Sequence, residues 1–409
     1  MIELRKQTAL DDKIAICIIL LMATGAVFVF SASANISQDI DLRHFYNSAS
    51  LRQILFFPLA ILIMFAASAI NYHRFGFNKG LLKSPAVYAL ALSIALLAIV
   101  LYQRFHPVFP TLIPKIHNHY RWLKIPLGPI TVSFQPSELA KWAVVFFLAG
   151  LCAKEGFNLH LFRKRFLPLC TLIAIVVGLI IIEDLGTAAF IALLAFIMLA
   201  IAGAKWRHLL APVPFALIAF CLILWLYPHR MQRIVAFLKP TELADSANYQ
   251  ANQSLIALGS GGLFGKGLGS GICKYGHLPE DTTDFIFAII GEEFGFVGTA
   301  AVITLFIAFL WLGILVVKRC KDDFGKILAA GIMLTIAIQA AINIGVVTVV
   351  LPTKGIPLPF VSAGGTSMLL SAAAVGILLN IAKQTNKEQT NEPLQTNETA
   401  VTLQALESM

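Results

Sequence analysis

The stretch Leu278-Pro279-Glu280-Asp281-Thr282-Thr283-Asp284-Phe285-Ile286-Phe287 starts polar and ends in a long apolar run. Three carboxylates crowd into five positions just before that run begins. A charged side chain close to hydrocarbon is costly and usually has a function. The stretch therefore predicts a polar mouth leading into a membrane helix, with Asp284 as a possible proton acceptor at its start.

The composition around this stretch is that of a membrane protein. Of 409 residues, 58% are hydrophobic and 13% are charged, and the mean hydropathy is +0.80. A typical soluble domain carries about 25% charged residues. Several runs exceed the ~18 apolar residues that indicate a spanning helix. We predict an all-α polytopic membrane protein, so the length does not translate into a number of soluble domains.

Hydropathy along the chain predicts about ten transmembrane helices. The expected spans are 13–34, 51–70, 85–102, 137–153, 166–182, 187–204, 209–227, 284–317, 327–349 and 367–382. The eighth is longer than a simple crossing of about 20 residues. It contains Gly291, Gly295 and Gly298, so a bend is expected there. The expected domains are a cytoplasmic N-terminus (1–12), a membrane domain (13–382) and a polar, disordered cytoplasmic tail (383–409).

The basic residues predict the orientation. With the N-terminus inside, most of the 31 Lys and Arg residues fall in inner segments and cluster at helix ends. Both termini are then cytoplasmic, and the net charge of +9 does not indicate a nucleic-acid partner. Two long outer loops are expected, roughly 103–136 and 228–283, together with a shorter one at 350–366. Loops of this length are uncommon unless they have a function.

The cysteines predict neither a disulfide framework nor a zinc site. The six are scattered in or beside apolar runs, and Cys273 with His277 has no second ligand pair. The N-terminal apolar run, 14–30, is longer than the core of a usual signal peptide, about 7–15 residues. We interpret it as an uncleaved first helix.

Two motifs at expected helix starts have both structural and functional interpretations. Gln135-Pro136-Ser137-Glu138 is typical of a helix start. Glu138 and Lys141 share a helix face, so they either neutralise each other or act at the outer membrane surface. Asp284, with the threonines before it, could simply cap its helix. Alternatively, partial burial would raise its pKa into the range of a general base.

Several other polar groups fall on or near the outer side. The glycine-rich run 259–271 fails the phosphate-loop patterns and is expected to be a tightly turned loop, whose amides could still meet an anionic headgroup. Glu292 and Glu293 lie inside an apolar span, which indicates a function or a structural network.

Arg121-Trp122 fits either an aromatic belt or a phosphate-binding cation. The segment 351–367 is rigid with proline and carries Lys354 as its only charge. Together these features fit an anionic, lipid-linked substrate at the outer leaflet.

At these residues the chain resembles the SEDS family (shape, elongation, division and sporulation), which includes FtsW, RodA and SpoVE. The resemblance covers about 10–382, and the segments 253–257 and 351–355 look more like FtsW than RodA. The matching segments are Arg121-Trp122, Gln135-Pro136-Ser137-Glu138 with Lys141, Asp184-Leu185-Gly186-Thr187, Arg230 with Arg233, Tyr249-Gln250 with Gln253-Ser254 and the glycine run, Leu278 through Phe287, Gly291-Glu292-Glu293, and Lys354 through Ser367. The chain departs from the family pattern at Glu183, where proline is common, at Lys239 and at Ala363.

The resemblance implies a peptidoglycan glycosyltransferase with ten helices in the cytoplasmic membrane of a bacterium. It would polymerise lipid II at the outer face in cell division, beside a class B penicillin-binding protein and other division or elongation proteins. The essential acid of the family falls on Asp284. The supporting or substrate-binding residues would be Glu138, Lys141, Arg121, Trp122, Gln135, Ser137, Arg233, Gln250, Ser254, Glu280, Lys354, Ser362, Gly364 and Gly365.

A divalent cation, Mg²⁺ or Mn²⁺, would assist with the pyrophosphate; its protein ligands are unassigned, and no organic cofactor is expected. Two alternatives remain open from the residues themselves. The chain could transport a lipid-linked precursor as a flippase, because polar groups within membrane spans serve transport equally well. It could also be a non-enzymatic division scaffold.

Overall fold

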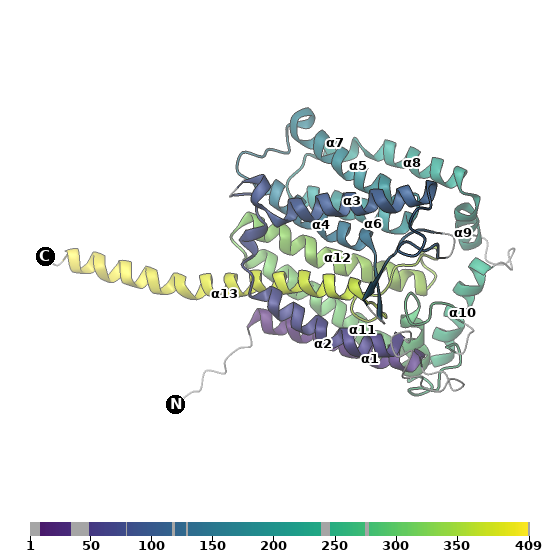
Figure 1. The fold of residues 1–409 in the computed structure, drawn as a ribbon. Coiled ribbons are helices and arrows are strands. Elements are labelled where there is room, and N and C mark those ends of the chain that lie inside the picture. The colour runs from purple at the N-terminus through teal and green to yellow at the C-terminus, as the bar shows by residue number, and fades with distance from the viewer. Residues whose placement is uncertain are drawn as a thin grey trace.

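Long helices lying side by side make up most of the protein (Figure 1). The computed structural model describes residues 9–33, 49–78, 80–116, 119–127, 130–238, 246–274 and 278–407. The long helices are α1 (Leu10–Ser33), α2 (Ala49–Ser68), α3 (Pro85–Phe105), α4 (Pro136–Cys152), α5 (Leu167–Ile181), α6 (Leu185–Ile201), α8 (Val213–Leu226), α11 (Ile286–Arg319), α12 (Asp323–Val347) and α13 (Thr366–Glu407). Each expected span overlaps one of these helices.

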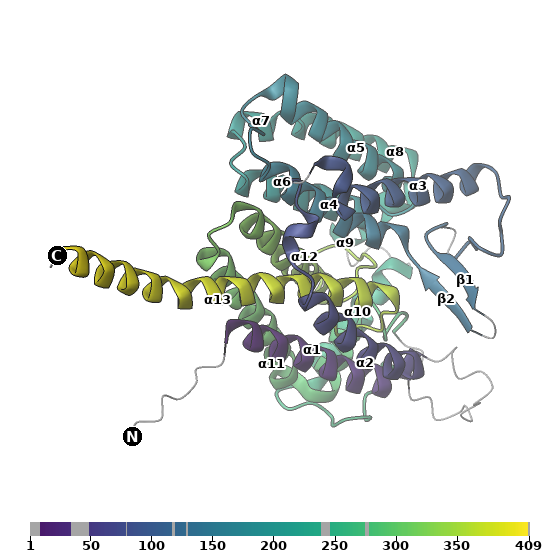
Figure 2. The same ribbon diagram turned by 60° about the vertical axis from the view of Figure 1, so that its left-hand side comes forward.

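Further elements connect these helices. They are the 3₁₀ turns η2 (Tyr72–Phe75) and η3 (Leu81–Lys83), the π turn η4 (Phe162–Phe166), the helices α7 (Trp206–Leu210), α9 (Pro228–Leu238) and α10 (Ser246–Gly261), and the strands β1 (Leu123–Leu127) and β2 (Ile130–Phe134). The strands form an antiparallel ribbon in which Leu123 pairs with Phe134. Figure 2 shows this ribbon at the end of the bundle away from the start of α1.

The helical, polytopic fold that hydropathy predicts is confirmed. Among the described residues, seven helices are long and apolar enough to cross a membrane by length and composition, and α2 and α6 are shorter apolar helices. The number of ten crossings therefore stays a prediction, as do the orientation and the disordered tail after 383. His277 and Lys239 lie outside the described residues.

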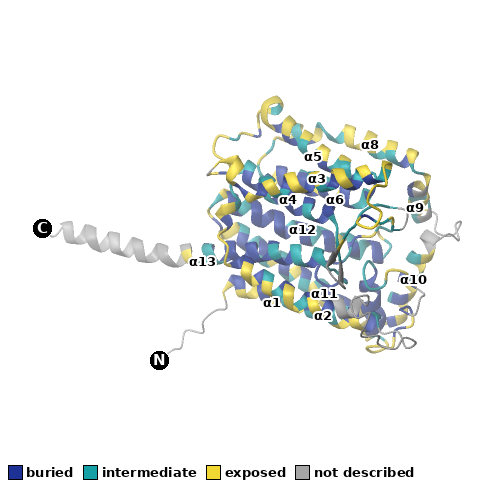
Figure 3. Cartoon of the chain, viewed as in Figure 1, coloured by how far each residue is buried: buried dark blue, intermediate teal, exposed yellow. Residues whose placement is uncertain are grey.

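Burial separates inner helices from outer ones (Figure 3). Of the apolar window of α12, 67% is buried, against 11% for the span Trp206–Leu226, which contains α7 and α8. α12 packs against α11, α4 and α6, and α13 packs along α2 and against α1. The exposed side chains of α8 are large and apolar, including Phe215 and Trp225, each 75% exposed. Such a face suits lipid, so α8 lies at the rim and α12 at the centre.

The bend expected in the eighth span is confirmed at Gly295, whose φ of 64° interrupts α11. The break leaves backbone groups without helical partners, and the glycine-rich run supplies them. The amides of Lys266 and Gly267 donate to the carbonyls of Glu292 and Glu293 at 3.0 and 2.9 Å. In return, the carbonyls of residues 262 and 263 accept from the amides of residues 296 and 297. These amides of the glycine run are therefore committed to α11 and not to an anionic headgroup.

The two acids inside α11 belong to a structural network. Both Glu292 and Glu293 have an exposed fraction of 0%. Glu292 pairs with Lys266, with 2.7 Å between Oε1 and Nζ, and accepts from two loop amides. Glu293 pairs with Lys274 at 2.9 Å and accepts from the Ser31 hydroxyl of α1. The pairs tie the loop after α10 to α1 and α11, because a buried carboxylate requires such partners.

Candidate functional site

A cavity of about 860 Å³ opens at the end of the bundle that carries the β-ribbon. Four helices begin at this cavity, namely α4, α6, α11 and α13, and residues at or beside each start line it. Helix N-termini favour negative charge. Twelve of the residues expected at the site line the cavity: Arg121, Trp122, Gln135, Glu138, Lys141, Arg233, Gln250, Glu280, Asp284, Lys354, Gly364 and Gly365.

Three expected site residues support the walls instead. The Ser137 hydroxyl accepts from the Gln135 side chain at 2.9 Å. The Ser254 hydroxyl is buried and donates to the carbonyl of Val347 at 2.7 Å, which joins α10 to α12. The Ser362 hydroxyl donates to the carbonyl of Thr283 and accepts from a loop amide. Ser362 therefore fixes the loop after α12 against the segment that carries Asp284.

Asp284 lies at the cavity wall just before α11, partly buried. The N-cap of α11 is Phe285, and no side chain caps the helix. Within the described part of the chain, no hydrogen bond or ion pair engages the Asp284 carboxylate, whereas its backbone carbonyl accepts from the Asn343 amide at 2.8 Å. The capping interpretation is therefore wrong for this side chain, and its carboxylate is available to a ligand.

Electrostatics at Asp284 favour a proton acceptor that works near neutral pH. Burial raises the pKa of Asp284 to about 7, the negative charges of Glu280 and Asp184 add to the rise, and Arg121 opposes it. The backbone turn before Asp284 is strained, since Glu280 has a φ of 57°. The carbonyl of Glu280 accepts from the amides of Thr283 and Phe285, which closes the turn and directs Asp284 toward the cavity.

Glu138 and Lys141 form a buried ion pair in another wall. Lys141 Nζ lies 2.8 Å from Glu138 Oε2, and the Lys141 side chain is 1% exposed. Lys141 also donates to Gln339 of α12 at 2.9 Å, and Ser367 at the start of α13 donates to Glu138. The two residues neutralise each other and join three helices beside the cavity. The mutual neutralisation expected for this pair is confirmed, and a role at the outer membrane surface stays a prediction.

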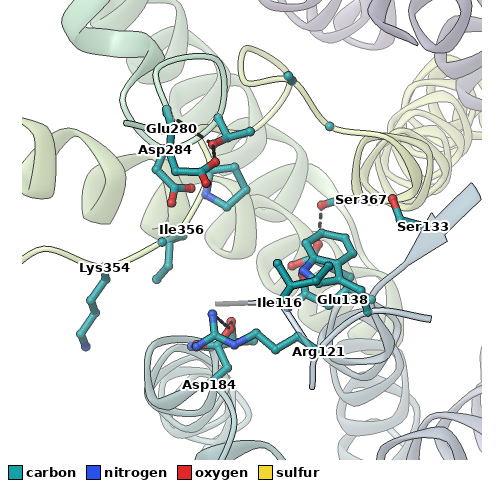
Figure 4. Close-up of a pocket in the computed structure, with 18 of the residues that line it drawn as sticks. Ile116, Arg121, Ser133, Glu138, Asp184, Glu280, Asp284, Lys354, Ile356 and Ser367 are labelled. Atoms are coloured by element: carbon teal, nitrogen blue, oxygen red, sulfur yellow. Dashed lines mark hydrogen bonds and ion pairs between the residues drawn. The ribbon is translucent and has the colours of Figure 1, made fainter. Parts of the chain in front are cut away.

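The wall opposite Asp284 carries Arg121 and Asp184 (Figure 4). Arg121 Nη1 lies 3.7 Å from Asp184 Oδ2, and Arg121 Nε donates to the carbonyl of Glu183 at 2.9 Å. Asp184 also caps α6 by accepting from the Thr187 amide at 3.0 Å. The Arg121 side chain remains 31% exposed. It therefore presents a positive charge to the cavity while its other atoms are held in place.

Lys354 supplies a second cation. Its ammonium group has no hydrogen bond or ion pair to any described residue. Burial lowers the pKa of Lys354, and the nearby Asp184 carboxylate opposes that change. Its side chain passes α6 closely, because a Cβ added at Gly186 would lie 3.5 Å from Lys354 Cδ. Arg121 and Lys354 are thus two cations near one helix start.

Sequence reasoning missed several polar residues that build the site. Gln339 and Asn343 of α12 donate to the carbonyls of Pro357 and Ile356, at 2.9 and 2.8 Å, and so hold the proline-rich loop. Their signal is an amide inside an apolar span. Glu183, Asp184 and His119 were also not assigned a role, although Asp184 lies in a segment that carries the family resemblance.

The described residues hold no group of three or more His, Cys, Asp or Glu side chains that could bind a metal ion. Two of the acids at the cavity are instead paired with cations, Glu138 with Lys141 and Asp184 with Arg121. The residues present thus do not form a protein-only metal site. The expected divalent cation stays a prediction.

The fold and the site define a polytopic helical membrane protein with a charged cavity at one end of its bundle. A family model for the FtsW, RodA and SpoVE proteins, described as "Cell cycle protein", matches residues 11–387. The chain belongs to this family, as its sequence motifs predict.

Curated relatives match along almost their whole length. Stage V sporulation protein E of Bacillus subtilis is 35% identical, and the match covers 92% of this chain and 98% of that protein. A probable peptidoglycan glycosyltransferase FtsW of Geobacter is 33% identical, with 93% and 98% covered. The family and the extent of the match agree with the resemblance seen in the sequence.

Solved structures share the fold. A chain of a peptidoglycan synthase complex, studied for the coordination of polymerization and crosslinking, matches with a TM-score of 0.68 at 23% identity, covering 91% of this chain and 97% of that one. The rod shape determining protein RodA of Thermus thermophilus matches with a TM-score of 0.61 at 24% identity, covering 91% and 96%. At this identity the likeness concerns the architecture.

Proposed function

We propose that this protein is a peptidoglycan glycosyltransferase that polymerises lipid II at the outer face of the cytoplasmic membrane. The observation that carries the proposal is the Asp284 carboxylate, which has no described partner, has a pKa raised to about 7 and lies on a cavity shared with Arg121 and Lys354. A relative named as a probable peptidoglycan glycosyltransferase supports it.

In this reaction Asp284 removes the proton from the 4-hydroxyl of the acceptor sugar. The freed oxygen attacks the anomeric carbon of the donor, and the bond from that carbon to the pyrophosphate breaks. Undecaprenyl pyrophosphate leaves with the bonding electrons, and one displacement converts the α-linked donor into a β-linked product. General-base assistance of this kind is worth roughly 10²–10⁴-fold.

The positive charge around the cavity suits the leaving group. Arg121 and Lys354 provide positive charge, and the four helix starts at the cavity add their partial positive ends. Lys141 is already paired with Glu138, so its role is to set the shape of the wall and not to bind the pyrophosphate directly. Preorganised positive charge of this sort stabilises the charge that develops in the transition state.

The placement of the site supports the proposed topology. The start of α1 and the long extension of α13 lie at one end of the bundle, and the cavity elements lie at the other (Figure 1). With both termini cytoplasmic, the cavity faces outward. A class B penicillin-binding protein that cross-links the product strands is the proposed partner, and division is the proposed process.

The test is a polymerisation assay with purified protein and lipid II in detergent, with and without the candidate partner. Detergent abolishes compartments, so a flippase would leave lipid II unchanged, and so would a scaffold. We expect glycan polymer from the wild type and none from Asp284→Asn. The matched control is Asp323→Asn, because the Asp323 side chain is 80% exposed and Asp323 is not among the residues that line the cavity. Wild-type polymer from Asp284→Asn would contradict the assignment.

A further inference from the structure

Glu183 lies between α5 and α6 and is 4% exposed. Its carboxylate gathers groups from a distant loop. Arg104 Nη1, at the end of α3, donates to Oε1 at 2.6 Å. The amide of Tyr120 donates to Oε2 at 2.9 Å, and His119 Nδ1 lies 3.3 Å from the same oxygen. One side chain thus binds both the last turn of α3 and the residues just before Arg121.

The backbone of the same residue completes the arrangement. The carbonyl of Glu183 accepts from Arg121 Nε at 2.9 Å, and the next residue, Asp184, faces Arg121 Nη1 at 3.7 Å. The residues just before Arg121 are therefore held by the Glu183 carboxylate, and Arg121 itself by the Glu183 carbonyl. A guanidinium on a long loop would otherwise sample many positions, and ordering it on binding would cost conformational entropy. Because Glu183 fixes Arg121 before the substrate binds, substrate binding does not bear this entropic cost.

The Glu183 carboxylate stays charged across the physiological range. Its burial would raise its pKa, but hydrogen bonds from His119, Arg104 and the Tyr120 amide outweigh burial and lower the pKa to about 2. A buried carboxylate is stable only with such partners. Arg104 and the loop depend in turn on the Glu183 charge, because neutralising Glu183 removes the charged acceptor that holds them.

We propose that Glu183 is a positioning residue that holds Arg121 over the cavity, where Arg121 binds the anionic pyrophosphate of the donor. This inference rests on the proposed function. Glu183 touches no reacting atom and acts only through the loop and Arg121. Losing a hydrogen-bonded anchor for a charged group should lower kcat/KM by about tenfold. The loss should fall mainly on KM, because most of the negative charge of the pyrophosphate is already present in the ground state and only part of it develops in the transition state.

The test is a double-mutant cycle with Glu183→Gln, Arg121→Gln and the combined variant in the lipid II polymerisation assay. We expect Glu183→Gln to raise KM about tenfold and the combined variant to equal Arg121→Gln alone, because Glu183 has nothing left to position. Glu183→Asp keeps the charge and should recover part of the loss. If the two single losses multiply in the combined variant, or if Glu183→Gln behaves as the wild type, the proposal is overturned.

A second measurement does not need activity. Hydrogen exchange of the wild type and Glu183→Gln, both in detergent, should show exchange at the Tyr120 amide at least about tenfold faster in the variant, with α5 and α6 unchanged. Asp323→Asn is the control that should alter neither loop nor KM. If the wild type and this control form no polymer, the proposed function fails while the exchange result still tests the anchor. Unchanged exchange at Tyr120 overturns the anchor itself.

Discussion

The backbone of Gly355 lies against the carboxylate of Asp284, so closely that a Cβ at Gly355 would come within 2.8 Å of Asp284 Oδ2. Real Cβ atoms essentially never approach this closely, and one of the two groups would have to move. The loop that carries Gly355 is held by Asn343 and Gln339 of α12. Its position is therefore firm, and the Asp284 side chain is the part free to yield.

Gly355→Ala is expected to displace the Asp284 carboxylate and lower kcat by about 10- to 100-fold, because a misplaced base loses most of its contribution. Polymerisation rates at saturating lipid II measure this. Gly178→Ala is the matched control, since a Cβ at Gly178 in α5 would meet nothing within 4 Å. Equal rates for the two variants would show that the position of Asp284 does not depend on Gly355.

The pH dependence of polymerisation should follow the ionisation of Asp284. A general base must be deprotonated, and burial raises the pKa of Asp284 to about 7. The rate should therefore fall by about tenfold per pH unit below 7 and level off above it. A profile of kcat against pH from 5 to 9 measures this. A rate that stays flat down to pH 5 would contradict Asp284 as the titrating base.

Ionisation of Asp284 as the pH rises should lower the stability of the protein, whereas it should raise the activity. A carboxyl whose pKa is raised in the folded state contributes stability below its ordinary pKa, and the contribution is lost as pH rises through 7. At pH 8 the wild type therefore carries a partly buried negative charge that lowers the free energy of unfolding, and Asp284→Asn lacks this charge. We expect the inactive Asn variant to unfold at a higher temperature than the wild type at pH 8 and to lose most of this advantage at pH 5. Thermal unfolding in detergent at both pH values measures the difference.

The Glu293–Lys274 pair should matter for stability and not for chemistry. Both side chains are almost fully buried, with exposed fractions of 0% and 1%. Glu293→Gln leaves a buried ammonium without its carboxylate, which costs about 3–5 kcal/mol in comparable pairs. We expect a clearly lower unfolding temperature, whereas disrupting the exposed Lys326–Asp323 pair with Asp323→Asn should change little. Similar unfolding temperatures for the two variants would contradict the structural role of the network.

Sequence reasoning reached the helical membrane class, the family and the bend in α11, because hydropathy and glycine act over short stretches of chain. It also singled out Asp284, since an acid at the start of an apolar run stands out in any arrangement of the helices. It left Glu138 and Lys141 between two interpretations, and it assigned no role to Glu183 or Gln339.

Asp284, Glu292 and Glu293 have the same chemistry and lie within ten positions of one another. The sequence alone determined that all three are close to an apolar span. Only the tertiary structure decided that Glu292 and Glu293 are paired with lysines from the loop after α10, while Asp284 faces a cavity. The physical reason is that the cost of a buried charge depends on its partners, and those partners come from segments distant in the chain. Local pattern locates the charge, and the packing of remote segments determines whether it is neutralised or left available for chemistry.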